Sequence, residues 1–131
     1  LGGTIACGFS GPRRPYAGSA RDFVLGSRII NGQAEVLHFG GEVMKNVAGY
    51  DVSRLMVGAM GTLGLLLDIS LKVLPMPEQE LTVARECTVA DAICLMNEWA
   101  GSPLPISAAC YDGAQLNVRL SGTETAIIAG S

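Results

Sequence analysis

Residues 40–64 contain six glycines within 25 positions: Gly40, Gly41, Gly49, Gly58, Gly61 and Gly64. Wherever alanine would serve equally well, each glycine costs roughly 0.5–1 kcal/mol of folding free energy, because the unfolded chain has more freedom to lose. Repeated glycine is therefore expected where the backbone bends sharply or lies very close to another group. The run predicts a ligand, or another domain, lying against the backbone.

The composition indicates a piece of a larger protein. Of the 131 residues, 49% are hydrophobic and only 16% are charged, against about 25% charged in an average soluble protein. The uncharged stretch at residues 55–67 is too short for a membrane helix, which needs about 20 apolar residues. The chain also starts at Leu1 and stops inside an apolar run. We therefore expect a fragment, truncated at its C-terminus, that self-associates through exposed apolar surface.

Charge and cysteine spacing exclude two classes of function. A net charge of −3 leaves no basic patch for nucleic acid. The four cysteines, Cys7, Cys87, Cys94 and Cys110, show no C-x-x-C spacing, so we predict no zinc site and no iron–sulfur cluster. Apolar neighbours of these cysteines favour free thiols in a reducing cytoplasm.

The sequence of the first half of the chain predicts short elements separated by glycines. Residues 1–11 predict a turn, a short strand or helical turn, and a loop, and residues 11–18 predict a loop because of two prolines. Asn31-Gly32 between apolar runs at residues 23–30 and 35–39 predicts an antiparallel hairpin. Asp51 can cap a short helix over residues 52–57 that ends at Gly58, before a strand at residues 65–74.

A different pattern follows Pro77. A strand over residues 81–87, a helix opened by Thr88 and a hairpin around Asp112-Gly113 are expected in that order, with a second helix from Thr123. We expect one apolar face of this helix to be formed by Val89, Ile93, Met96 and Ala100. The order β-α-β-β-α is most of a ferredoxin-like lobe. We therefore place a boundary at residues 75–78.

The glycine spacing at Gly58-x-x-Gly61-x-x-Gly64 invites comparison with a dinucleotide fingerprint, but the context differs. A fingerprint follows a strand and opens a helix, whereas here a helix precedes the glycines and a strand follows them. His38, the single histidine, is more often structural than catalytic at such a place in a strand. No Ser-His-Asp arrangement can be built around it.

Two sets of polar residues can each be interpreted in two ways. Lys45-Asn46 and Tyr50-Asp51 lie in a glycine-bounded loop, where they either contact a ligand or face solvent with Asp51 as a helix cap. Arg13-Arg14 is either a solvated loop tip or a contact for an anionic group on a cofactor or partner.

Two stretches of the chain resemble the vanillyl-alcohol oxidase/p-cresol methylhydroxylase (PCMH) family of FAD-binding domains. The first is residues 2–14 with Tyr16-x-Gly18-x-x-Arg21-Asp22, and the second is residues 45–51 with the Gly58–Gly64 motif. Within that family the combination is most similar to the flavin-binding subunits of bacterial glycolate oxidases. The resemblance is strong over residues 1–77 and weaker to residue 124.

The resemblance implies an α+β fold. Residues 1–77 would be the second subdomain, the C-terminal half, of a PCMH-type FAD-binding domain, and residues 78–131 a partial ferredoxin-like cap lobe. The family's first subdomain, with its pyrophosphate-binding loop, has no counterpart here, so we expect no FAD on this fragment alone. The cofactor-binding residues implied are Gly2, Gly3, Thr4, Cys7, Gly8, Ser10, Gly11, Gly64 and Leu65; no metal is implied, and no catalytic residue can be assigned.

The implied function is oxidation of glycolate to glyoxylate through FAD in the full-length protein, in a complex with a second flavoprotein subunit and an iron–sulfur subunit. The implied location is the cytoplasm, peripheral at the inner membrane if the complex attaches there. Two departures from the family pattern, Met60 in place of glutamate and Leu67 in place of threonine, favour a non-catalytic scaffold as the alternative. Another FAD-dependent 2-hydroxy-acid oxidase is a further alternative.

Overall fold

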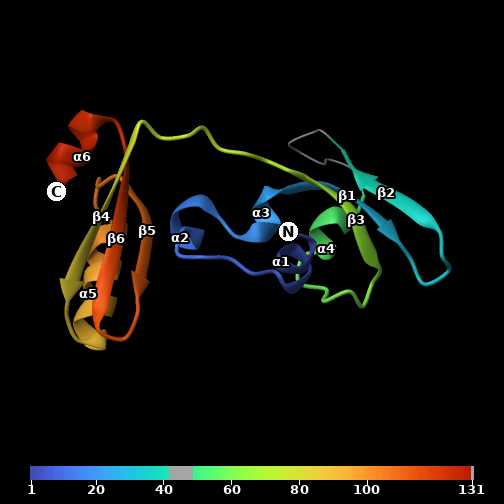
Figure 1. The fold of residues 1–131 in the computed structure, drawn as a ribbon, viewed down its shortest axis with the longest axis horizontal. Coiled ribbons are helices and arrows are strands. Elements are labelled where there is room, and N and C mark those ends of the chain that lie inside the picture. Colours follow the sequence, from blue (N-terminus) through green and yellow to red (C-terminus); the bar gives the residue numbers. More distant parts are fainter. Residues whose placement is uncertain (42–48, 131) are drawn as a thin grey trace. The chain divides into compact units, whose positions relative to one another are not determined.

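The computed structural model describes residues 1–41 and 49–130. Contacts divide the chain into two compact units (Figure 1). Unit 1 comprises Leu1–Ser10 and Gly18–Leu74, and unit 2 comprises Gly11–Ala17 and Pro75–Ser131. Both units combine short helices with an antiparallel sheet. The expected α+β class is confirmed.

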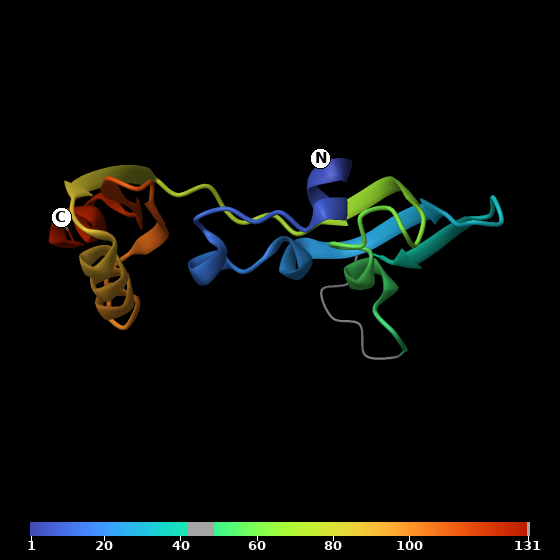
Figure 2. The same cartoon turned by 90° about the horizontal axis from the view of Figure 1, so that it is seen from below.

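Unit 1 contains a three-stranded sheet in the order β2-β1-β3. Its strands are β1 (Val24–Ile30), β2 (Val36–Gly40) and β3 (Leu65–Leu71), and its helices are α1 (Gly2–Cys7), α3 (Ala20–Phe23) and α4 (Val52–Leu55). Helix α1 lies beside β3, and α4 contacts β1 and β2 (Figure 2). Ile5, Val24 and Val57 form the buried core between these elements.

The predicted hairpin of unit 1 is confirmed, with β1 and β2 antiparallel. Its turn is held by Asn31, whose Oδ1 accepts hydrogen bonds from the backbone N–H groups of Gln33 and Glu35 at 2.9 and 3.0 Å. The left-handed position of the turn is occupied by Ala34, with φ of 62°, and not by Gly32. The side chain of Asn31 therefore shapes a five-residue turn, longer than the tight Asn-Gly turn.

Helix α4 begins where it was predicted to begin. Asp51 Oδ1 accepts a hydrogen bond from the backbone N–H of Arg54 at 3.0 Å, which satisfies one unpaired amide of the first turn. The helix is shorter than predicted, ending at Leu55, and Gly58 follows with φ of 84°. The prediction of a loop throughout residues 11–18 was wrong, because Arg14–Ala17 forms one helical turn, α2.

Unit 2 follows the predicted order of elements: β4 (Gln79–Glu86), α5 (Val89–Ala100), β5 (Ile106–Tyr111), β6 (Gln115–Gly122) and α6 (Glu124–Gly130). The sheet order is β4-β6-β5, with both pairs antiparallel. Thr88 Oγ1 accepts from the backbone N–H of Asp91 and caps α5. Asp112 Oδ1 accepts from the N–H groups of Ala114 and Gln115 at 3.0 and 2.8 Å and fixes the β5–β6 turn.

The apolar face predicted for α5 was right at Met96 and wrong at its other three positions. Val89 and Ile93 are 59% and 52% exposed, and Ala100 is exposed as well. The residues that pack against the sheet are Ala92, Leu95, Met96 and Trp99. Their spacing is also helical, so periodicity alone could not choose between the two faces; the large indole of Trp99 lies on the packed one.

Candidate functional site

The two glycine-rich motifs of the sequence lie side by side in unit 1. The backbone N–H of Gly58 donates to the carbonyl of Ile5 at 3.1 Å, and the N–H of Met60 donates to the carbonyl of Ala6 at 2.8 Å. These bonds tie the C-terminal end of α1 to the turn before β3. The structure therefore brings together residues 2–8 and residues 58–65, which hold most of the residues that the resemblance implied for the cofactor.

Two glycines of this region are required by the protein's own packing. A Cβ on Gly8, whose φ is +67°, would lie 3.2 Å from the Cα of Gly58. A Cβ on Gly64 would lie 2.7 Å from the carbonyl oxygen of Ile30, closer than real Cβ contacts allow. The presence of glycine at these two positions is explained by the contact of one backbone with another, without a ligand.

Gly2 and Gly3 have no such explanation. Both lie in α1 without a positive φ, and a Cβ at either position would meet nothing within 4 Å. Because glycine in a helix costs up to about 1 kcal/mol relative to alanine, the protein's own fold gives no reason for it here. The open backbone leaves room for an external group, and this fits the cofactor wall implied by the resemblance.

The surface around this backbone is apolar. Leu1, Phe9, Met60, Leu63 and Leu65 are all exposed, between 48% and 78%. Thr4 and Cys7 are exposed on α1, and Ser10 Oγ accepts a hydrogen bond from the N–H of Ala20 at 2.9 Å. Cys7 is the one residue with an ionisable side chain in residues 1–10 and 56–65. Such a surface can bind and shield a ligand, but it offers little acid–base chemistry.

The other polar candidates lie elsewhere. Lys45 and Asn46 are outside the described residues. Tyr50 is 95% exposed, and Asp51 is the cap of α4. His38 lies opposite Arg28 in the β1–β2 ladder, beside the ion pair of Arg28 with Asp68. This polar hollow on the sheet also includes Ser70 and has a volume of about 170 Å³.

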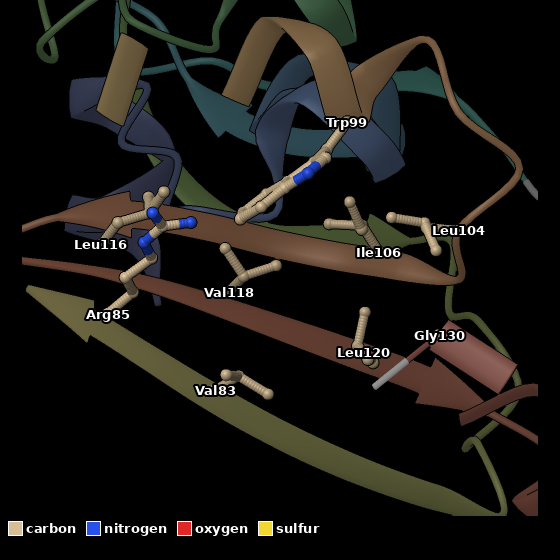
Figure 3. Close-up of a pocket in the computed structure, with 9 residues that line it drawn as sticks. All are labelled: Val83, Arg85, Trp99, Leu104, Ile106, Leu116, Val118, Leu120 and Gly130. Carbon is tan, nitrogen blue, oxygen red and sulfur yellow. The ribbon is translucent and has the colours of Figure 1, made fainter. Parts of the chain in front are cut away.

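Two hollows of unit 2 are lined mainly by residues of its strands. The first, about 190 Å³, lies between the sheet and the helices and is almost wholly apolar (Figure 3). Trp99 lies over the strands there, with Arg85 at the side. The second, about 230 Å³, is lined by residues that include Arg13 and Arg119. Sequence reasoning singled out Arg13 but missed Arg119, because the two are 106 positions apart and only the fold brings them together.

The described part of the chain lacks two kinds of feature. No helix there is long and apolar enough to cross a membrane. Among the same residues, no group of three or more histidine, cysteine or acidic side chains lies close enough together to hold a metal ion.

Comparison with known proteins gives a clear relative. No family model matches the chain. Over 126 residues, 96% of this chain, it is 56% identical to the glycolate oxidase subunit GlcE of Escherichia coli strain K12, of which it covers 36%. The predicted resemblance is confirmed. Glycolate oxidase subunit GlcD of Bacillus subtilis strain 168 is 37% identical over 63% of the chain and 18% of that protein. D-lactate dehydrogenase of Anaerostipes hadrus is 32% identical over 63% of the chain and 18% of its own length.

Solved structures agree on the fold. A chain of alkyldihydroxyacetonephosphate synthase superposes with a TM-score of 0.74 at 16% identity, covering 99% of this chain and 30% of that one. At this identity the likeness concerns the fold alone. The chain therefore spans about a third of the length of these proteins, 36% of the GlcE relative and 30% of the synthase.

Proposed function

We propose that this chain is part of an FAD-dependent oxidoreductase subunit that oxidises glycolate to glyoxylate. The observation that carries the proposal is the 56% identity to a protein named glycolate oxidase subunit. Other relatives are named for D-lactate and D-2-hydroxyglutarate, and one is named an FAD-linked oxidoreductase. Glycolate, lactate and 2-hydroxyglutarate are all 2-hydroxy acids, so the shared chemistry is oxidation of the carbon that bears the hydroxyl group.

In this proposal unit 1 supplies one wall of the flavin site. The residues of unit 1 that form it are Gly2, Gly3, Thr4, Cys7, Gly8, Ser10, Gly64 and Leu65; the resemblance also implies Gly11, which belongs to unit 2. FAD, when bound, supplies the acceptor for the hydride of the substrate. The protein contributes the backbone of Gly2 and Gly3, which the flavin can approach because no Cβ intervenes. The exposed apolar residues around these glycines exclude water from the bound flavin. Residues 1–77 would be the C-terminal half of the FAD-binding domain, and residues 78–131 part of a ferredoxin-like cap.

A scaffold role is the second candidate. Met60 and Leu67 replace the polar residues that the family often carries, and residues 1–10 and 56–65 contain no ionisable side chain except Cys7. In that case the subunit holds its partners and the turnover takes place elsewhere. The partners we propose in either case are a second flavoprotein subunit and an iron–sulfur subunit, in the cytoplasm or peripheral at the inner membrane. For residues 1–131 alone we expect no retained FAD and self-association through the exposed apolar residues.

The deciding experiment uses the protein at its natural length, purified without its partners. Its visible absorbance would show near-stoichiometric flavin, and anaerobic glycolate would bleach the flavin bands. A folded but colourless protein, with circular dichroism typical of α+β structure, would reject the flavin proposal in favour of the scaffold. Flavin that binds but is not bleached by glycolate would reject the substrate while leaving the cofactor in place.

A further inference from the structure

The hollow of about 230 Å³ in unit 2 owes its shape to small side chains on β5. Ala108 and Cys110 line it from β5, and Ala108 is 8% exposed, whereas the side chain of Ala109 packs against the apolar core. The segment Gly11–Ala17 lies along the same strand, held by a hydrogen bond of 3.3 Å from the N–H of Ala109 to the carbonyl of Pro12. Larger side chains on β5 would fill this space, so small residues and the neighbouring segment together leave it open.

The polar groups of this hollow are cationic or neutral. Arg13 and Arg119 line it together with Thr82 and Asn117, and no acidic side chain lines it. Among the described residues Arg13 has no ion pair and its side chain has no hydrogen bond. In a chain of net charge −3, Arg13 thus provides a positive charge without an acidic partner among the described residues.

Arg119 is only partly engaged by the protein. Its Nε donates to Ser107 Oγ at 3.2 Å and lies 3.7 Å from Glu80 Oε1. Glu80 is shared, since its Oε1 also accepts from Ser121 Oγ at 3.0 Å. The two terminal nitrogens of Arg119 have no partner within residues 1–41 and 49–130, and its side chain is 30% exposed. Partial burial weakens the screening of this charge by water and so strengthens its attraction for an anion.

We propose that this hollow binds a small organic carboxylate, held between Arg13 and Arg119. The planar guanidinium of arginine donates two parallel hydrogen bonds to a carboxylate, which lysine cannot do. The small side chains of Ala108 and Cys110 suit a short carbon chain, whereas inorganic phosphate has no apolar part that could lie against them. This site requires no flavin, so it goes beyond the proposed function and stands or falls separately.

Cys110 provides a direct probe of the hollow because it lines the site and its thiol is exposed. We would measure alkylation of each cysteine by neutral iodoacetamide, using mass spectrometry, on the protein at its natural length. Glycolate, acetate, inorganic phosphate and neutral glycolamide would be compared at equal ionic strength. Cys94, an exposed thiol on α5 that does not line this hollow, is the internal control.

The proposal expects glycolate and acetate to slow alkylation of Cys110 and leave Cys94 unchanged, with glycolamide ineffective. Arg13→Gln should raise the glycolate concentration needed for half-maximal protection about tenfold, since a charge-assisted hydrogen bond is lost. Arg14→Gln is the matched control, because Arg14 is the adjacent residue and does not line the hollow. Arg13 is exposed on a surface segment, so its substitution leaves the fold intact.

Three outcomes would overturn the proposal. Equal protection by glycolamide would show that the negative charge is not recognised. Stronger protection by phosphate than by glycolate would assign the site to inorganic oxyanions and reject an organic acid. Equal effects of Arg13→Gln and Arg14→Gln, or no protection by any ligand, would reject the hollow as a site. None of these results bears on flavin content, which is measured separately by absorbance.

Discussion

Gly8 lies against Gly58, and a Cβ on Gly8 would be 3.2 Å from the Gly58 Cα. The contact joins the C-terminal end of α1 to the turn before β3, and the hydrogen bonds from Gly58 to Ile5 and from Met60 to Ala6 join the same two segments. The two motifs that carry the family resemblance thus meet through their backbones, at the place where both motifs have glycine.

Gly8→Ala should destabilise unit 1. A left-handed conformation costs a residue with a Cβ roughly 1–2 kcal/mol, and the contact with Gly58 adds to that cost. Urea denaturation followed by circular dichroism measures the change. Gly32→Ala is the control in the same unit, since a Cβ there meets nothing within 4 Å and its φ is not positive. Equal stability of the two variants would contradict the close packing of Gly8.

Gly3→Ala should separate ligand binding from folding. The substitution favours α1 by up to about 1 kcal/mol, because alanine is the better helix former, and it introduces no clash with the protein. If the flavin lies against this backbone, the flavin content of the full-length protein falls while its thermal stability without flavin is kept or raised. Unchanged flavin content would remove Gly3 from the proposed cofactor wall.

Ser27 and Ser53 should respond in opposite directions to alanine. Both are buried, at 3% and 1% exposure. Ser53 Oγ donates to the carbonyl of Phe39 at 2.8 Å, whereas Ser27 Oγ has no hydrogen-bond partner in the described structure. Removing the unsatisfied hydroxyl should stabilise unit 1 by about 1 kcal/mol, and removing the satisfied one should destabilise it by about as much. The midpoints of urea unfolding at constant m-value measure both changes; a loss of stability in Ser27→Ala would point to a partner for its hydroxyl.

Asp112 should make unit 2 sensitive to acid. The backbone N–H groups of Gln115 and Ala114 donate to its carboxylate and hold its pKa below the ordinary value of 3.8. A carboxyl whose pKa is lower in the folded state stabilises the fold above its unfolded pKa, and that contribution is lost as the pH falls through the folded pKa. Stability should therefore decline below about pH 4, and Asp112→Asn should flatten this decline. Circular dichroism from pH 2 to 6 would follow the loss of structure in both proteins. An identical loss of stability at low pH in the variant would exclude Asp112 as a cause of the acid sensitivity.

Local signals in the sequence predicted most of the elements. Asn31, Asp51, Thr88 and Asp112 each organise a turn or helix start through their own side chains, within a few residues of their position. Such signals can be read without the fold. The prediction for α5 failed because its sequence offers two apolar faces, and the choice depends on what the sheet presents to the helix.

Contacts between distant residues could not be predicted in this way. The sequence shows glycine at positions 8, 58 and 64, but it does not say that Gly8 and Gly64 are required by backbone contacts while Gly3 is free of them. Arg13 and Arg119 likewise become neighbours only because Gly11–Ala17 lies along β5. The family resemblance identified the glycine-rich segments, and the structure separates those that the fold requires from those that it leaves open.

The segment Gly11–Ala17 also bears on the order in which the protein is made. It precedes β5 by about ninety residues of synthesis and belongs to unit 2, although both of its flanks belong to unit 1. Strand β5 is at one edge of its sheet. The unpaired N–H and C=O groups of an edge strand can pair with a strand of another chain. When β5 leaves the ribosome, the residues that lie along it have already emerged, so this edge can be covered as soon as it forms. A chain begun at Pro75 would contain every strand of unit 2 and still lack that protection.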